Sequence, residues 1–231
     1  MKGILLVDKP EGWTSFDVVN YVRKMVASIE GKKPRNVKVG HTGTLDPAAT
    51  GVLVLCVGKE YTTKVPQLIK QDKVYEVELT LGKTSSTCDK EGEIVVKSAK
   101  VPTQDAVEKT IKRFVGEIMQ SPPAHSAVKI NGVRAYKLAR DGKEVKIEPR
   151  PVTIHAITDI QYKYPRLIFT AHVGSGTYIR SLAQDIGEVL ECGAYMSNLR
   201  RTVVGTYTIA EAYPVSELSE LVLEKVLEHN R

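Results

Sequence analysis

The chain carries an uninterrupted apolar run, Gly51-Val52-Leu53-Val54-Leu55-Cys56-Val57, just after the peptide Gly40-His41-Thr42-Gly43-Thr44-Leu45-Asp46-Pro47. Pro47 fixes its own φ and biases Asp46 towards an extended conformation, while Gly40 and Gly43 permit backbone angles that bulkier residues resist. We therefore expect a tight turn that leads into a strand. Such a turn either presents the Asp46 carboxylate to a substrate or holds it in an Asx-turn with its own backbone.

The composition is that of an ordinary globular chain. Hydrophobic residues make up 42% and charged residues 26% of the 231 residues, enough for one large domain or two small ones. No apolar run approaches the length of a membrane span, and we expect no signal peptide. Cys56, Cys88 and Cys192 are widely spaced without a CxxC pair. We therefore expect no disulfide framework, no zinc site and a cytoplasmic location.

Positive charge is concentrated in one stretch of the chain. The formal net charge is +6, and residues 129–150 hold seven bases against three acids, a local excess of +4. From residue 211 onward, five acids oppose two bases, a local charge of −3. This asymmetry favours a basic face that meets a polyanion such as nucleic acid. The alternative is a solvated segment with scattered lysines.

Hydrophobic patterning predicts a mixture of helices and strands. Ser15 is expected to cap an amphipathic helix that runs to Val26, Thr103 opens a second helix, and a final acidic helix begins at Ser216. Asp89 lies in a predicted turn. Further helices are expected at 135–140 and 181–190, and strands at 4–7, 74–81, 93–96, 152–157 and 167–173. Because these elements lack a regular βαβ rhythm, we predict an α+β fold.

A glycine-rich turn, Gly174-Ser175-Gly176, leads into the predicted helix at 181–190 and places Tyr178 and Arg180 near its start. An aromatic ring can stack on a base, and an arginine can hold a carboxylate or phosphate in a two-pronged geometry. The alternative is a structural role, in which Tyr178 packs inside the protein and Arg180 is exposed to solvent.

A lone carboxylate such as Asp46 has few reactions available to it. It can act as a general base, a nucleophile or an electrostatic stabiliser. A glycosidase would need a second carboxylate across the bond, and no partner motif is evident. The five histidines are scattered along the chain, so a metal site is not expected.

Several motifs together resemble those of TruB-type tRNA pseudouridine synthases. They occur in the family's order between residue 3 and about residue 205: 3–15, 40–53, 73–75, 121–140, 176–182, 187–194 and 199–201. The resemblance implies a single catalytic domain over residues 1–231, with a mixed, largely antiparallel sheet and flanking helices. It also implies a thumb-like RNA-binding insertion at about 121–150. The family usually continues into a C-terminal PUA domain, which we do not expect here.

The resemblance implies that this chain isomerises uridine 55 in the tRNA T-loop to pseudouridine, without cofactor or metal. Asp46 would be the essential catalytic residue, Tyr75 would stack on the flipped uracil, and Arg180 would pair with Asp46. His41 would fill the gap that the flipped base leaves in the stack.

Further substrate contacts are implied for pocket-lining and basic side chains. These are Tyr178, Ile179, Leu199, Lys129, Arg134, Lys137, Arg140 and Lys143. His125 stands where many relatives have tyrosine, which leaves that contact open. The partner would be the tRNA T stem-loop, bound by a monomer that needs no membrane and no obligate protein partner. The alternatives are a non-catalytic T-loop-binding folding factor and an RNA-guided, dyskerin-like synthase.

Overall fold

The computed structural model describes residues 1–126, 128–130, 132–142, 145 and 147–228, without the side chain of Arg140. The chain forms two compact units: unit 1 is Met1–Tyr75 with Arg200–Arg231, and unit 2 is Glu76–Leu199. Strands β4 (Lys73–Leu81) and β12 (Ala194–Val204) each have residues in both units.

Unit 1 is built on strands in the order β14-β1-β3-β12, with β2 paired to β3 and β13 to β12. β1 runs antiparallel to β3, whereas β14 on β1 and β12 on β3 are parallel pairs. The strands are β1 (Gly3–Lys9), β2 (Val39–His41), β3 (Thr50–Val57), β13 (Tyr207–Thr208) and β14 (Tyr213–Pro214). The helices are α1 (Ser15–Ile29), α2 (Lys59–Thr62), α3 (Val65–Leu68) and α7 (Glu220–Val226), with short 3₁₀ turns at Pro34–Asn36, Ile209–Glu211 and Val215–Glu217.

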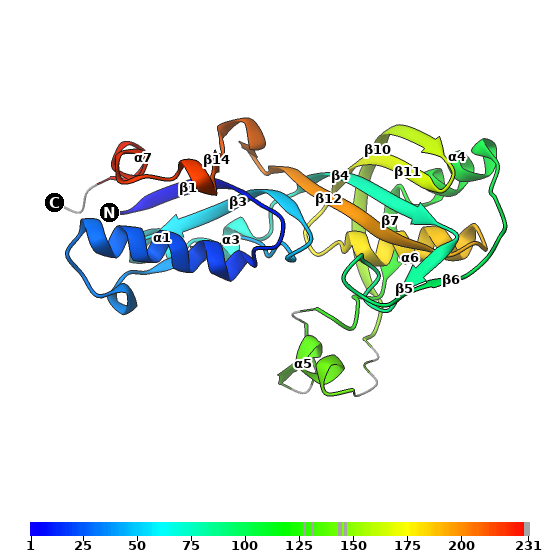
Figure 1. Cartoon of the computed structure of the whole chain (residues 1–231), viewed down its shortest axis with the longest axis horizontal. Coiled ribbons are helices and arrows are strands. Elements are labelled where there is room, and N and C mark those ends of the chain that lie inside the picture. The colour runs from blue at the N-terminus through cyan, green and yellow to red at the C-terminus, as the bar shows by residue number, and fades with distance from the viewer. Residues whose placement is uncertain (127, 131, 143–144, 146, 229–231) are drawn as a thin grey trace. The chain divides into compact units, whose positions relative to one another are not determined.

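The apolar run of β3 is buried because both of its faces are covered. Leu53 and Leu55 pack into a cluster with the apolar side of α1, which lies along β1 and β3 in Figure 1. Val52 and Val54 point to the opposite face and pack against Val204. A strand covered on both faces reads as a continuous apolar run rather than as an alternation.

Two predicted helix starts differ from the structure. α1 is capped by Thr14, which forms a capping box with Asp17, so the prediction of Ser15 as the cap was wrong. Ser15 is the first helical residue, and its hydroxyl bonds elsewhere. The final helix begins at Glu220 with Ser219 as its cap rather than at Ser216, because residues 215–217 form a separate 3₁₀ turn.

Unit 2 continues with strands in the order β12-β4-β11-β10-β7. β10 pairs antiparallel with both β11 and β7. The strands of this sheet that lie wholly in unit 2 are β7 (Gly116–Gln120), β10 (Arg150–Lys163) and β11 (Arg166–Val173), and its larger helices are α4 (Gln104–Arg113) and α6 (Ile179–Val189). Two small hairpins complete the unit: β5 (Lys83–Ser85) with β6 (Ile94–Val96), and β8 (Lys129–Ile130) with β9 (Val133–Arg134), which is followed by α5 (Ala135–Arg140).

The α+β prediction, with a mixed and largely antiparallel sheet and flanking helices, is confirmed. Thr103 caps α4 as predicted. All three cysteines are free. In the described part of the chain, no helix is long and apolar enough to cross a membrane. A single catalytic domain with a thumb insertion stays a prediction.

Replacement of Gly51 by alanine should destabilise unit 1 severely. Gly51 has φ +106°, and a Cβ there would lie 2.2 Å from the backbone oxygen of Arg201 on the neighbouring strand. We expect Gly51→Ala to lower the free energy of unfolding by about 3 kcal/mol or more, measured by urea denaturation.

Gly12 is the matched control, because it also has a positive φ, +81°, but open space around its Cβ position. Gly12→Ala should cost only about 1 kcal/mol. Equal losses for the two variants would contradict this account of Gly51.

Candidate functional site

The Asp46 side chain is half-buried in the loop between β2 and β3 in unit 1. The backbone turns here, since the Ala49 N–H donates to the Asp46 carbonyl at 3.0 Å, and β3 begins at Thr50. This confirms the predicted turn ahead of a strand.

Ser15 holds this loop from the first turn of α1. Its buried hydroxyl donates to the Leu45 carbonyl and accepts the Leu45 N–H, both at 2.8 Å. A side chain thirty residues earlier therefore satisfies both backbone groups of the residue that precedes Asp46.

The loop is also held from β1. The Lys9 side chain is fully buried, and its ammonium donates to the carbonyls of Trp13 at 2.6 Å, Pro10 at 2.9 Å and Pro47 at 3.4 Å. The Gly12 N–H donates to the same Pro47 carbonyl at 2.9 Å. Buried ammonium groups need such partners, because desolvation of an unpaired charge is costly.

Arg201 supports the other end of the loop. Its side chain is 1% exposed, and it donates to the Gly43 carbonyl at 3.0 Å and the Val52 carbonyl at 2.8 Å. Gly43, Leu45 and Pro47 are thus each fixed by a side chain from another element, which restricts the position of Asp46 between them.

His41 lies at the end of β2 and is partly buried. Its Nδ1 accepts the Gly43 N–H at 3.3 Å, which assigns the proton of the neutral ring to Nε2. Burial is the main cause that lowers the pKa of His41, and the positive charge of Arg201 adds to it. The uncharged ring is suited to stacking.

Tyr75 is buried on β4, 7% exposed, and Lys73 lies two residues before it. The Lys73 ammonium donates to the carbonyls of Ile69 and Gln71. Burial and the nearby Arg201 lower the pKa of Lys73 to about 8. Two buried bases, Lys73 and Arg201, therefore raise the positive potential of this part of unit 1.

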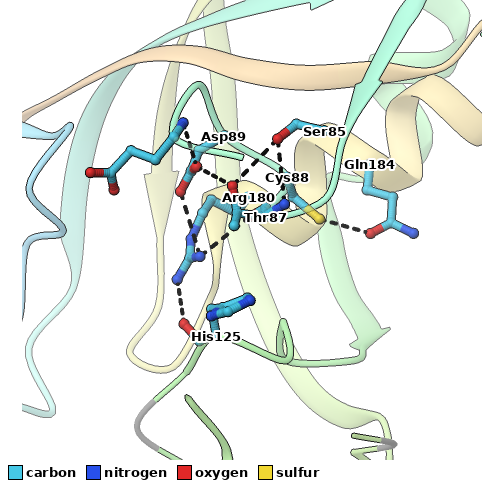
Figure 2. A network of polar contacts seen from close by, with 8 residues as sticks. Ser85, Thr87, Cys88, Asp89, His125, Arg180 and Gln184 are labelled. Carbon is cyan, nitrogen blue, oxygen red and sulfur yellow. Dashed lines mark hydrogen bonds and ion pairs between the residues drawn. The ribbon is translucent and has the colours of Figure 1, made fainter. Parts of the chain in front are cut away.

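In unit 2, Arg180 is the centre of a polar network at the start of α6 (Figure 2). Its guanidinium lies 3.5 Å from the Asp89 carboxylate, and it donates to the carbonyls of His125 at 2.8 Å and Thr87 at 3.3 Å. Asp89 is 2% exposed and also accepts from the Thr87 hydroxyl and the Glu91 N–H. A buried arginine and a buried carboxylate thus compensate each other's charge.

The predicted pocket-lining residues lie in two places in unit 2. Tyr178 is the residue before α6, and its N–H donates to Gln120 Oε1 at 2.8 Å. Ile179 follows it and is 4% exposed. Leu199 lies on β12 and is 8% exposed.

The predicted RNA-binding bases lie in residues 121–150, the predicted thumb, which we call the thumb segment. Lys129, Arg134 and Lys137 are exposed, and Lys129 faces Arg134 across the β8–β9 pair. Arg140 ends α5. Lys143 lies outside the described residues.

Family models match most of the chain, from residue 30 to residue 229. Residues 30–179 match the N-terminal domain of TruB family pseudouridylate synthases, and residues 180–229 match the tRNA pseudouridylate synthase B C-terminal domain. The chain belongs to the TruB family.

Comparison with individual proteins supports the same family. The tRNA pseudouridine synthase B of Clostridium kluyveri is 43% identical over 229 residues, which cover 98% of this chain and 76% of the relative. That of Cupriavidus metallidurans is 45% identical over 219 residues, 94% of this chain and 67% of the relative. A chain in the crystal structure of a Cbf5-Nop10-Gar1 complex is similar with a TM-score of 0.72 and 30% identity. The match covers 98% of this TruB-family chain but only 57% of that one.

The chemical roles of the predicted site residues stay predictions, but the structure shows contacts around them that the sequence did not indicate. Nothing in the sequence indicated that Lys9, Ser15 and Arg201 bond the backbone of the Asp46 loop. Asp89 was predicted only to lie in a turn. Asp89 does cap a turn, but it also faces Arg180. Asp46 belongs to unit 1 and Arg180 to unit 2, so their pairing stays a prediction.

The lowered pKa of His41 makes stability depend on pH. As the pH falls below the ordinary value of 6.5, His41 takes up a proton in the unfolded chain before it does so in the folded chain. The free energy of unfolding should therefore fall as the pH drops through this range. Replacement with glutamine should remove this contribution, so wild type should lose more stability than His41→Gln between about pH 8 and pH 5 in urea titrations. Identical pH profiles would show that His41 is not held neutral.

Proposed function

We propose that this protein isomerises uridine 55 in the T-loop of tRNA to pseudouridine. The N-glycosidic bond between N1 and the ribose C1′ breaks, the uracil turns, and a bond forms between C5 and C1′. C5 then loses its proton and N1 gains one, so the product is an isomer of uridine. The protein acts as a cytoplasmic monomer on the tRNA T stem-loop, without cofactor or metal and without an obligate protein partner.

The observation that carries this proposal is the braced loop around Asp46 in a TruB-family chain. A catalytic carboxylate must be held in a productive geometry before the substrate arrives. Three buried side chains that bond the backbone at residues 43, 45 and 47 provide such support. We assign Asp46 the catalytic role, at the ribose or at the base.

Arg180 and Tyr75 complete the catalytic group in this proposal. A guanidinium beside Asp46 favours the ionised carboxylate. Asp89, opposite Arg180, holds that guanidinium in place. Tyr75 stacks on the flipped uracil and assists loss of its C5 proton, while Tyr178, Ile179 and Leu199 line the pocket.

His41 acts on the RNA rather than on the reacting base. Extrusion of a nucleotide costs a few kcal/mol of stacking and pairing, and an aromatic ring in the vacated space offsets part of it. A neutral imidazole suits this place better than an imidazolium, because the charged ring would lose more hydration on insertion.

Replacement of Asp46 tests the catalytic assignment. Wild type should form one pseudouridine in the T-loop of an unmodified tRNA transcript, and Asp46→Asn should be slower by at least about 10⁴-fold under single-turnover conditions. Asp105→Asn is the control, since that carboxylate is 72% exposed and pairs only with Lys109 on the same helix among the described residues. Binding of the transcript by wild type without modification would contradict the enzyme assignment.

The thumb segment should contribute salt-dependent affinity. Each phosphate contact adds about 0.7–0.9 to the slope of log affinity against log salt. The triple alanine variant of Lys129, Arg134 and Lys137 should therefore flatten this slope by about 2 in filter-binding titrations. Lys109→Ala should leave it unchanged, and an unchanged slope in the triple variant would exclude the thumb bases from phosphate contact.

A further inference from the structure

Residues 120–126, which we call the thumb root, run from the end of β7 into the thumb segment and are docked on the start of α6 by three hydrogen bonds. The Tyr178 N–H donates to Gln120 Oε1 at 2.8 Å, and the Ser181 hydroxyl donates to the Ser121 carbonyl at 2.7 Å. Arg180 donates to the His125 carbonyl at 2.8 Å (Figure 2). The root is therefore tied to the same helical turn that carries two of the proposed site residues.

Two buried polar atoms at the ends of this root have no hydrogen-bond partner among the residues described. They are Gln120 Nε2 and Ser126 Oγ, on side chains that are 2% and 4% exposed. Such groups are uncommon in folded proteins, because each loses its hydration without gaining a bond. Within the described part of the chain, the root thus holds two donors without an acceptor.

The acceptor that these donors lack is an oxygen, and the net positive charge of the segment that follows them indicates which kind. The amide nitrogen can only donate, and the hydroxyl can donate to an anion. The same thumb segment exposes Lys129, Arg134 and Lys137, which attract phosphate groups. A phosphodiester oxygen of bound RNA is the acceptor that fits both observations.

We propose that Gln120 and Ser126 form an RNA-binding subsite at the thumb root, where both side chains donate to phosphate oxygens of the bound tRNA. This subsite rests on the proposed function. Because both atoms are covered in the free protein, the root shifts when RNA binds. That shift breaks the bond between Arg180 and the His125 carbonyl, so it couples RNA binding to the position of the Arg180 guanidinium.

Ser126→Ala tests the subsite, because it removes a hydroxyl that has no hydrogen-bond partner among the described residues. Its melting temperature should equal or exceed that of wild type. Its affinity for a T stem-loop RNA, measured in the Asp46→Asn background so that no turnover occurs, should fall by about tenfold or more. The salt dependence should stay unchanged, since no positive charge is removed.

Ser181→Ala is the matched control. It removes a hydroxyl that is bonded in the free protein, so its melting temperature should fall. The subsite proposal would be wrong if Ser126→Ala left the affinity for the T stem-loop RNA unchanged. It would also be wrong if the variant lost affinity and melting temperature together. If the Asp46→Asn variant binds the stem-loop and wild type modifies it, the proposed function stands even when the subsite fails this test. If the Asp46→Asn variant does not bind the stem-loop, both the proposed function and the subsite are wrong.

Discussion

Side-chain hydrogen bonds to the backbone of residues 43–47 are the constraint on which the rest of this site depends. This loop has no regular ladder of hydrogen bonds to satisfy its carbonyls, and without other support it would adopt many conformations. Arg201, Ser15 and Lys9 form hydrogen bonds with the backbone on both sides of Asp46, and these bonds select one conformation of the loop. The position of the proposed catalytic carboxylate is therefore set by unit 1, before any RNA is present.

Two of these side chains, Arg201 and Lys9, are buried cations, and Lys73 is a further buried cation near Arg201. Burial of His41 and of Lys73, together with the positive charge of Arg201, lowers the pKa of both side chains. The positive charge of these buried bases also favours a negative charge nearby. A polyanionic substrate and an ionised carboxylate are both stabilised by such surroundings.

Local sequence patterns predicted the elements, and long-range contacts account for what they missed. The spacing of Val18, Val22 and Val26 and the apolar run of β3 report burial directly, so α1 and β3 were predicted correctly. Ser15 resembled a helix cap by composition, but its hydroxyl bonds Leu45, thirty residues later. Lys9 and Arg201 resemble solvated bases in a sequence, because nothing local shows that carbonyls surround them. Asp89 faces Arg180 only in the folded unit.

A crystal structure of the protein with a T stem-loop RNA that carries 5-fluorouridine at the target position tests the central claim most directly. Fluorine replaces the C5 proton whose loss ends the reaction, so the bound base should be retained. We predict a flipped base beside Asp46, with residues 43–47 in the positions that they have in the free protein. The Arg180 guanidinium should lie against the Asp46 carboxylate. His41 should occupy the space that the flipped base leaves in the RNA stack. A target base bound away from Asp46, or a loop that rearranges to reach it, would contradict the account.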